Sequence, residues 1–326
     1  MPLKFIEFRQ LVQIFAMFMI VQFSGLLLAT QVFGGSTYQE LSSAQVISSP
    51  TSVLFYIVYI VIISALLLFF FKIYRGTKLF SIFEGAVILL SSFIVFSILV
   101  AIPAGSVQAD SLGSSDLLQF AVAVALALAL VIAKNKIPML RNAAAIIASI
   151  GVGIALGLSF SFQMAFIFMA ALGIYDFIAV FITKHMVALS KMAMSNNLSF
   201  LIMVSETKAV PMSYLSSAER KEYDKSKALL GKQSGIVKMF TKEHMALVPA
   251  LTALGTGDLA VPLMLAVSAY KVHLSFVPSF VIVFGSVLGL AFNMLVLRKY
   301  KRTLPAIPLL FAGIVIAMGA YLLAGI

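Results

Sequence analysis

The chain has 326 residues, of which 62% are hydrophobic and only 11% are charged, and its mean hydropathy is +1.09. A soluble core of this size needs no such composition, so we exclude a soluble globular protein. The chain contains no cysteine, which excludes disulfides, thiolate metal sites and cysteine nucleophiles. A net charge of +11 would suggest a nucleic-acid partner for a soluble protein, but the basic residues stand between apolar segments, where membrane topology explains them better.

Apolar segments of membrane length recur along the whole chain. A helix needs roughly 20 apolar residues to cross the hydrocarbon core, and the ten-residue alternation of an outer-membrane barrel is missing here. We therefore predict an all-α, multi-pass protein of the cell membrane with nine transmembrane helices. The predicted spans are residues 11–30, 53–71, 79–102, 117–133, 142–158, 162–183, 246–270, 274–297 and 304–325.

The first span and the division between the fifth and sixth spans need separate arguments. Residues 11–30 are too long an apolar stretch for a cleavable signal peptide, and no convincing small-residue cleavage site follows them. Residues 143–180 are almost continuously apolar, and only Ser159, Ser161 and Gln163 indicate a turn that would divide them.

The basic residues support this division and orient the chain. With nine spans, 22 of the 23 Lys and Arg residues fall on one face of the membrane, and only Lys271 falls on the other. Because loops rich in Lys and Arg stay in the cytoplasm, the N-terminus is predicted to be cytoplasmic and the C-terminus external.

This topology divides the chain into residues 1–183 with the first six spans, a cytoplasmic loop at 184–245, and residues 246–326 with the last three spans. A charged run in the loop, 219–225, is typical of a solvated linker or surface helix. The apolar run 198–204 is too short to span. It could lie in the membrane interface, form a strand or cover a neighbouring site, and the sequence does not decide between these alternatives.

Two aspartates interrupt the predicted spans, Asp176 in the sixth and Asp258 in the seventh. An acid at such depth costs roughly 3 kcal/mol or more, so it is a functional-site hypothesis by default. Asp176 stands eight residues before Lys184, roughly 12 Å along a helix, and Asp258 stands fourteen residues after His244, roughly 21 Å. The two acids can therefore reach similar depths on neighbouring spans.

A facing pair of carboxyl groups predicts a definite chemistry. Two carboxyls a few ångströms apart in a low-dielectric medium cannot both stay ionised, so they share a proton and titrate as a coupled pair. The ionised member can take a proton from water while the protonated member donates to a carbonyl oxygen, which hydrolyses a peptide bond without a covalent intermediate. No cofactor is required, and the three histidines stand at span ends, so we expect no metal site.

Small residues and a proline accompany Asp258. Gly255 and Gly257 remove two side chains before the acid, and Pro262 weakens the helix after it. These residues could admit water and a substrate backbone, although small residues also simply pack membrane helices. Tyr175 offers a hydroxyl beside the first acid, although a tyrosine in an aromatic-rich span is more often a packing residue.

A proline-containing segment, Pro305-Ala306-Ile307-Pro308, begins the predicted ninth span. Proline in the first turn is common at helix starts. Two prolines three residues apart would also leave backbone carbonyls unpaired and form a stiff wall that could hold a substrate as an extended strand. A similar run, Pro249-Ala250-Leu251, is interpreted as the start of the seventh helix.

In this order, Tyr175-Asp176, Gly255-Thr256-Gly257-Asp258 and Pro305-Ala306-Ile307 resemble the motifs of the presenilin and signal-peptide-peptidase family of intramembrane aspartyl proteases. That family has nine spans, with Tyr-Asp in the sixth, Gly-x-Gly-Asp in the seventh and Pro-Ala-Leu at the start of the ninth. The resemblance covers essentially the whole topology. It implies that the two aspartates are the catalytic pair and that the other motif residues shape the site and help to bind substrate. The chain departs from the family at Ile307, usually Leu, and at Thr256, commonly Leu in presenilins.

The resemblance also implies partners. The substrates would be transmembrane proteins or peptides within the lipid bilayer. A cytoplasmic N-terminus places the chain with presenilins rather than with the inverted signal peptide peptidases, and its compact size is similar to that of microbial, archaeal-type homologues. Such relatives are thought to act without accessory subunits, and we expect the same here. A homo-oligomer and self-cleavage in the 184–245 loop stay open.

Three other functions compete with this interpretation. A prepilin-type Gly-x-Gly-Asp peptidase would lack the Pro-Ala-Leu element and would hold its acids in differently arranged, shorter loops. A proton-coupled transporter would carry protons on the buried acids, and it would be expected to show a pseudo-repeat, which the sequence lacks. A cation channel through a water-filled cavity could coexist with protease activity.

Overall fold

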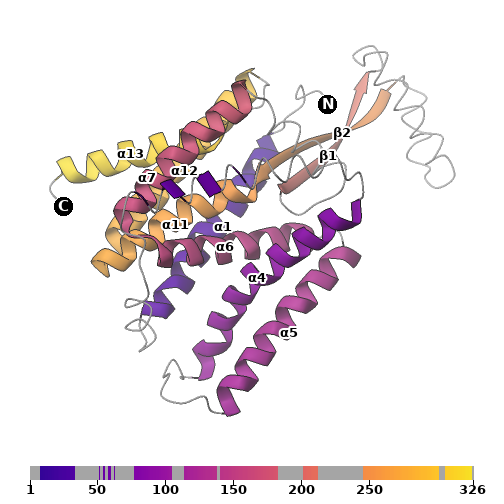
Figure 1. Cartoon of the computed structure of the whole chain (residues 1–326). Coiled ribbons are helices and arrows are strands. Elements are labelled where there is room, and N and C mark those ends of the chain that lie inside the picture. The colour runs from indigo at the N-terminus through magenta and orange to yellow at the C-terminus, as the bar shows by residue number, and fades with distance from the viewer. Residues whose placement is uncertain are drawn as a thin grey trace. The chain divides into compact units, whose positions relative to one another are not determined.

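The computed structural model describes most of the membrane-length segments of the chain. The described residues are 8–33, 51, 54–55, 58–59, 62, 77–104, 114–137, 140–182, 201–211, 245–300 and 305–324. Their helices (Figure 1) are α1 (Phe8–Phe33), α4 (Thr77–Ala104), α5 (Ser114–Lys136), α6 (Leu140–Ser159), α7 (Phe162–Phe177), α11 (Thr256–His273), α12 (Phe276–Tyr300) and α13 (Ile307–Leu323). Two strands, β1 (Leu201–Pro211) and β2 (Met245–Gly255), pair in a small sheet.

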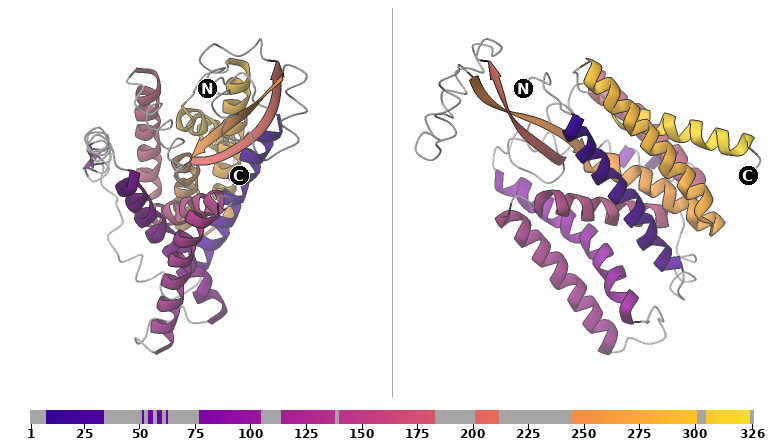
Figure 2. Two further views of the ribbon diagram at one scale, coloured as in Figure 1. Left: turned by 90° about the vertical axis from the view of Figure 1, so that its right-hand side faces the viewer. Right: turned by 180° about the vertical axis from the view of Figure 1, so that it is seen from behind.

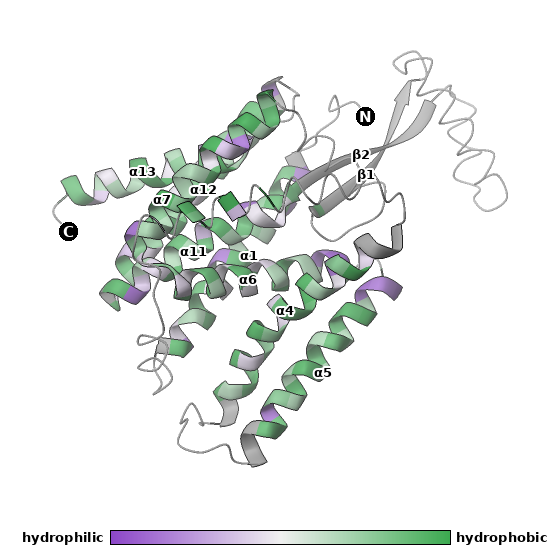
Figure 3. Cartoon of the chain, viewed as in Figure 1, coloured by the Kyte–Doolittle hydropathy of each residue, from purple (hydrophilic) through white to green (hydrophobic). Residues whose placement is uncertain are grey.

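Six of the described helices are long and apolar enough to cross a membrane, and α13 is a shorter apolar helix. Figure 3 shows apolar residues along most of the length of these helices. The membrane-length segments are Arg9–Val32, Ser81–Ile102, Leu117–Lys136, Leu140–Ser159, Phe162–Ile182 and Phe276–Leu297. A helical, multi-pass membrane protein is therefore confirmed, whereas the count of nine spans and their orientation stay predictions. The predicted second span, 53–71, lies largely outside the described residues.

The turn predicted between the fifth and sixth spans is present. Helix α6 ends at Ser159 and α7 begins at Phe162. Ser161 between them is extended, with φ −71° and ψ 156°, and its carbonyl accepts the first hydrogen bond of α7 from Ala165 N–H at 2.8 Å. Polar residues therefore marked a real break in an otherwise continuous apolar run.

The predicted seventh span, 246–270, is wrong in its first part. Residues 245–255 form the strand β2, and α11 begins only at Thr256. Gly255 is extended, with φ −68° and ψ 141°, and glycine is a poor helix former, so the helix starts after it. Pro249-Ala250-Leu251 accordingly lies within a strand and does not start a helix.

The strand β1 distinguishes between the alternatives left open for the apolar run in the loop. Residues Leu201–Pro211 pair with β2, so the described part of the apolar run, residues 201–204, lies in a strand. Most of this sheet belongs to a compact unit separate from the helical unit. The prediction of an all-α fold thus needs one correction, because a small sheet accompanies the helices.

Helix α11 is enclosed along most of its length. Every residue from Leu259 to Ala269 is buried, as expected for a helix that is apolar all round. The helix packs against α6, α7 and α12. Its first turn carries Asp258, so the neighbouring helices define where that acid lies.

Helices α4 and α5 run side by side (Figure 2) and share a buried ion pair. Lys134 Nζ lies 2.6 Å from Glu84 Oε1, and each side chain is only 3% exposed. A buried charge without a partner is strongly unfavourable, so each group stabilises the other. The charge pattern assigned Lys134 to a loop between spans, whereas in the structure its side chain forms a buried ion pair with Glu84.

Lys271 contacts the end of a helix. Its Nζ donates a hydrogen bond to the carbonyl of Leu158, in the last turn of α6. Carbonyls at a helix C-terminus have no intrahelical partner and carry partial negative charge, so a cation there is favourable. The ammonium group therefore caps α6.

Helices α12 and α13 pack backbone against backbone at glycines. A Cβ on Gly285 would lie 2.7 Å from Ile314 Cα, and a Cβ on Gly289 would overlap the carbonyl oxygen of Leu309. Small residues of this kind let membrane helices approach closely. Because α13 begins at Ile307, this packing sets the position of the proline-containing segment.

Candidate active site

Asp176 stands one residue before the end of α7, and its side chain is 6% exposed. The α-helical pattern ends at Phe177 and is followed by a π-helical turn, η2 (Ile178–Ile182). Single π-helical turns of this kind occur frequently at functional sites. The first acid therefore lies at a local irregularity of its helix.

Asp258 lies in the first turn of α11, three residues after the capping residue Gly255. The backbone N–H of Gly255 donates a hydrogen bond to the Asp258 carboxyl, as in a capping box. A Cβ on Gly255 would lie only 3.1 Å from Asp258 Oδ2. The missing side chain at Gly255 therefore leaves room for the carboxyl group.

The structure brings the two acids together. Helices α7 and α11 pack against each other, and the carboxyls of Asp176 and Asp258 are close enough to interact electrostatically. Among the described residues, no group of three His, Cys, Asp or Glu side chains is placed to hold a metal ion.

The proline-containing segment meets the first acid. Ile307 N–H donates to Asp176 Oδ2 over 3.4 Å, a long hydrogen bond, and the backbone N–H of Ala306 also bonds to this carboxyl. Ala306 caps α13, and Pro305, Ala306 and Ile307 are all buried. The N-terminus of a helix favours negative charge, typically by about 0.3–1 kcal/mol. The carboxyl of Asp176 thus meets the N-terminus of α13, and Asp258 lies in the first turn of α11.

The remaining predicted site residues adjoin the pair. A Cβ on Gly257 would meet no atom of the described residues within 4 Å, so they leave one side of the Asp258 turn open. Tyr175 and Thr256 are half-buried, each within two residues of an acid along the chain.

Two buried side chains outside the predicted site contact the main chain on either side of Asp258. Gln22 Nε2 donates to the carbonyl of Leu259 over 2.9 Å. Ser149 Oγ lies 3.3 Å from the carbonyl of Thr256, to which it can donate. Both side chains come from helices distant in sequence, α1 and α6.

The sequence contained a signal for each of these residues. Gln22 is a polar amide in the middle of the apolar first span, where polar groups are costly and often functional. Ser149, Gly153 and Gly157 recur at every fourth position, which puts small residues on one face of α6. Neither pattern contains an ionisable group, so each is a weaker indication of a functional site than the two acids are.

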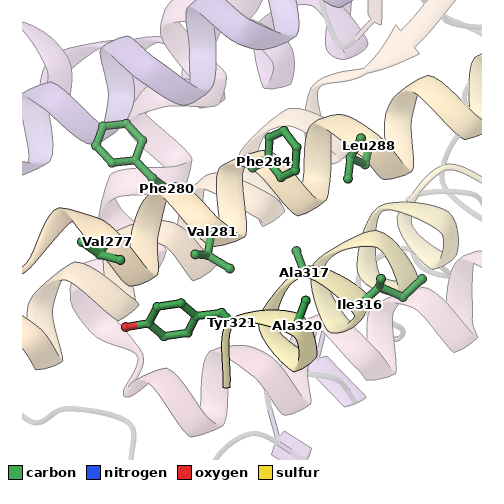
Figure 4. Close-up of a pocket in the computed structure, with 9 residues that line it drawn as sticks. All are labelled: Val277, Phe280, Val281, Phe284, Leu288, Ile316, Ala317, Ala320 and Tyr321. Carbon is green, nitrogen blue, oxygen red and sulfur yellow. The ribbon is translucent and has the colours of Figure 1, made fainter. Parts of the chain in front are cut away.

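A groove of about 560 Å³ lies between α12 and α13 (Figure 4). Apart from the hydroxyl of Tyr321, it is lined by apolar side chains, namely those of Val277, Phe280, Val281, Phe284, Leu288, Ile316, Ala317 and Ala320. None of the predicted site residues contributes to it. Its lining suits contact with apolar chains and offers no acid or base for hydrolysis.

A helical membrane protein with two aspartates on helices that pack against each other has the features of an intramembrane aspartyl protease. The chain belongs to the family described as signal-peptide peptidase, presenilin aspartyl protease, whose family model matches residues 15–326. The resemblance seen in the motifs is thereby confirmed, and membership of this family favours a protease over the transporter, channel and prepilin-type alternatives.

Solved structures share the fold. One, described as a presenilin family intramembrane aspartate protease in space group C222, superposes with a TM-score of 0.58 at 19% identity, covering 96% of this chain and 99% of that chain. A second, described in the same words in space group P2, gives 0.55 at 20% identity, covering 94% and 96%. A comparison with curated proteins finds no match.

Proposed function

We propose that Asp176 and Asp258 are the catalytic pair and that the enzyme hydrolyses peptide bonds within transmembrane segments of its substrates. The supporting observation is the convergence of three motifs. Ile307 N–H bonds to the Asp176 carboxyl, and Asp258 interacts with the same carboxyl electrostatically. Acids buried in a membrane protein are costly and rarely retained without a use.

In the proposed mechanism one carboxyl of the pair is ionised and the other is protonated. The ionised carboxyl takes a proton from water, whose oxygen attacks the carbonyl carbon, while the protonated carboxyl donates to the carbonyl oxygen. The tetrahedral diol then loses a hydroxyl proton to the newly formed carboxylate, and the amine nitrogen takes a proton from the other carboxyl as the C–N bond breaks. Both carboxyls return to their starting states, so the cycle requires no cofactor.

The motif residues around the pair are proposed to receive the substrate. The open side at Gly257 gives a peptide backbone access to Asp258. The segment Pro305–Ile307 adjoins Asp176 and can flank an extended peptide, the conformation in which a peptide bond is most accessible. Thr256 and Tyr175 stand beside the acids and are proposed to influence which substrate side chains fit.

The nine-span topology, with a cytoplasmic N-terminus and an external C-terminus, belongs to the same proposal. The distribution of 22 of the 23 basic residues on one face supports it. In this arrangement, residues 184–245 form the cytoplasmic connection between 1–183 and 246–326. We propose that the chain works without accessory subunits.

The test is cleavage of a single-span peptide substrate by detergent-purified protein. Asp176→Ala and Asp258→Ala are each expected to abolish cleavage, whereas Asp116→Asn in α5 is a carboxylate control expected to retain it. Full activity in either alanine variant would refute the proposed catalytic pair. As an independent check, cysteines at positions 176 and 258 should be joined by a short crosslinker in folded protein.

A further inference from the structure

Gln22 connects α1 to the turn that carries Asp258. Its side chain is 0% exposed, and its Nε2 donates to the carbonyl of Leu259, 237 residues away in the sequence. Leu259 directly follows Asp258. The amide of Gln22 therefore holds the main chain next to the acid.

Helix α6 holds the same turn from another helix. The hydroxyl of Ser149 contacts the carbonyl of Thr256 in addition to that of Ala145 within its own helix. Thr256 and Leu259 flank Asp258. Polar side chains from two helices thus contact carbonyls on both sides of one acid, and the shorter bond is the one from Gln22.

Leu263 adds an apolar contact to this arrangement. A Cβ on Gly25 of α1 would overlap the Leu263 side chain, and one on Gly153 of α6 would come within 2.7 Å of it. Leu263 therefore packs against two glycines, one on each helix. Gly25 follows Gln22, and Gly153 follows Ser149, by about one helical turn, so each helix uses one face for both contacts.

The hydrogen bond from Gln22 to the Leu259 carbonyl adds little to the stability of the fold. Leu259 lies inside α11, where the i to i+4 pattern of an α-helix assigns its carbonyl to the N–H of Leu263. The other amide atom, Gln22 Oε1, is buried and has no hydrogen-bond partner among the described residues. A buried acceptor without a donor is destabilising, and an apolar side chain of the same length would avoid that cost.

We infer that Gln22 is a positioning residue for the protease reaction: it fixes the first turn of α11 so that the Asp258 carboxyl faces that of Asp176. This inference rests on the proposed role of the aspartate pair. A misplacement on the order of 1 Å can cost roughly 100-fold in rate, so one bond to the adjacent carbonyl suffices to affect catalysis. Gln22 touches neither substrate nor the reacting atoms in this role.

The experiment replaces Gln22 by methionine in the full chain, which keeps the length of the side chain and removes both amide atoms. Ser279→Ala is the matched control, because Ser279 Oγ also donates to a carbonyl of α11, that of Ala266, about two turns beyond Asp258. Cleavage of a single-span peptide is measured for kcat and KM, and thermal unfolding of the same samples is followed in detergent.

For Gln22→Met we expect kcat to fall about tenfold to a hundredfold with KM unchanged and Tm equal to or above that of the wild type. Ser279→Ala should keep the wild-type kcat. An unchanged kcat in Gln22→Met overturns the inference. A fall in Tm by more than about 4 °C, or failure to fold, also overturns it, because Gln22 would then be a structural residue.

Asp258→Asn, assayed in parallel, separates the inference from the proposed function. If Asp258→Asn still cleaves the peptide, the proposed catalytic pair is wrong and the inference fails with it. If Asp258→Asn is inactive while Gln22→Met is fully active, only the inference about Gln22 fails.

Discussion

The backbone N–H of Ile307 donates to Oδ2 of Asp176 over 3.4 Å, across 131 residues of sequence. This bond joins the start of α13 to the end of α7. Any change that moves the start of α13 should therefore also move the carboxyl of Asp176, even where the substituted residue does not contact Asp176.

Gly289→Ala tests that connection. Its new Cβ would overlap the Leu309 carbonyl oxygen and lie 2.7 Å from Leu310 Cα, which are backbone atoms that cannot rotate away. We expect a loss of about 1–3 kcal/mol in stability and a reduced kcat in the protein that remains folded. Thermal unfolding and peptide cleavage measure the two effects.

Gly319→Ala is the matched control for Gly289→Ala. It lies in the same pair of packed helices, on α13, but its Cβ would meet no atom within 4 Å in the part of the chain that the structure describes. This variant should keep its activity and gain up to about 1 kcal/mol of stability, since alanine restricts the unfolded chain. Equal behaviour of the two variants would contradict the role assigned to the α12–α13 contact.

The two glycines before Asp258 should respond differently to alanine. In Gly255→Ala the Cβ would lie 3.1 Å from Asp258 Oδ2, so the carboxyl must shift, and we expect kcat to fall about tenfold or more. In Gly257→Ala the Cβ meets open space, so the protein should fold normally while the added methyl group narrows the substrate approach and raises KM. Steady-state kinetics separate these effects, and a reversed pattern would refute the open side proposed for Gly257.

The pH dependence of cleavage should be bell-shaped. At low pH both carboxyls of the pair are protonated and no base takes the proton from water. At high pH both are ionised and no acid donates to the carbonyl oxygen, so the rate falls again. Initial rates at fixed detergent and substrate concentration measure the profile. A rate that rises steadily across the pH range in which the protein stays folded would argue against a shared proton.

The buried pair Lys134–Glu84 predicts a non-additive effect on stability. Lys134→Met leaves Glu84 buried beside an apolar side chain and should cost about 3–5 kcal/mol. The double variant Lys134→Met/Glu84→Met removes both charges and should cost clearly less. Unfolding measurements on both single variants and the double variant give the coupling, and purely additive losses would show that the pair does not interact.

The sequence alone predicted the six membrane-length helices that the structure describes, because each apolar run is a local property. The break at Ser159–Ser161 was visible for the same reason, since polar residues interrupt the run where α6 ends. The two acids stood out because ionisable groups are rare in apolar segments. Features that depend on a single segment could therefore be predicted from the sequence.

The strand β2 could not be predicted in this way. Residues 246–255 are as apolar as a span, and only their pairing with β1, more than thirty residues earlier, makes them extended. Gln22 and Ser149 were visible as polar residues in apolar spans, but their contacts with α11 could not be predicted for a related reason. Their partners are backbone carbonyls at Leu259 and Thr256, and a carbonyl is present at every residue, so no side-chain motif marks the contact.

The contact of Lys271 with Leu158 changes how charge should be counted in this chain. A lysine bound to the last turn of α6 has its charge balanced by that helix end, so it says little about which side of the bilayer retains the segment during insertion. It was the one basic residue that opposed the predicted orientation. Topology rules based on Lys and Arg should give less weight to a cation that neutralises a helix end. If Lys271 is set aside for this reason, all the remaining basic residues lie on the face predicted to be cytoplasmic.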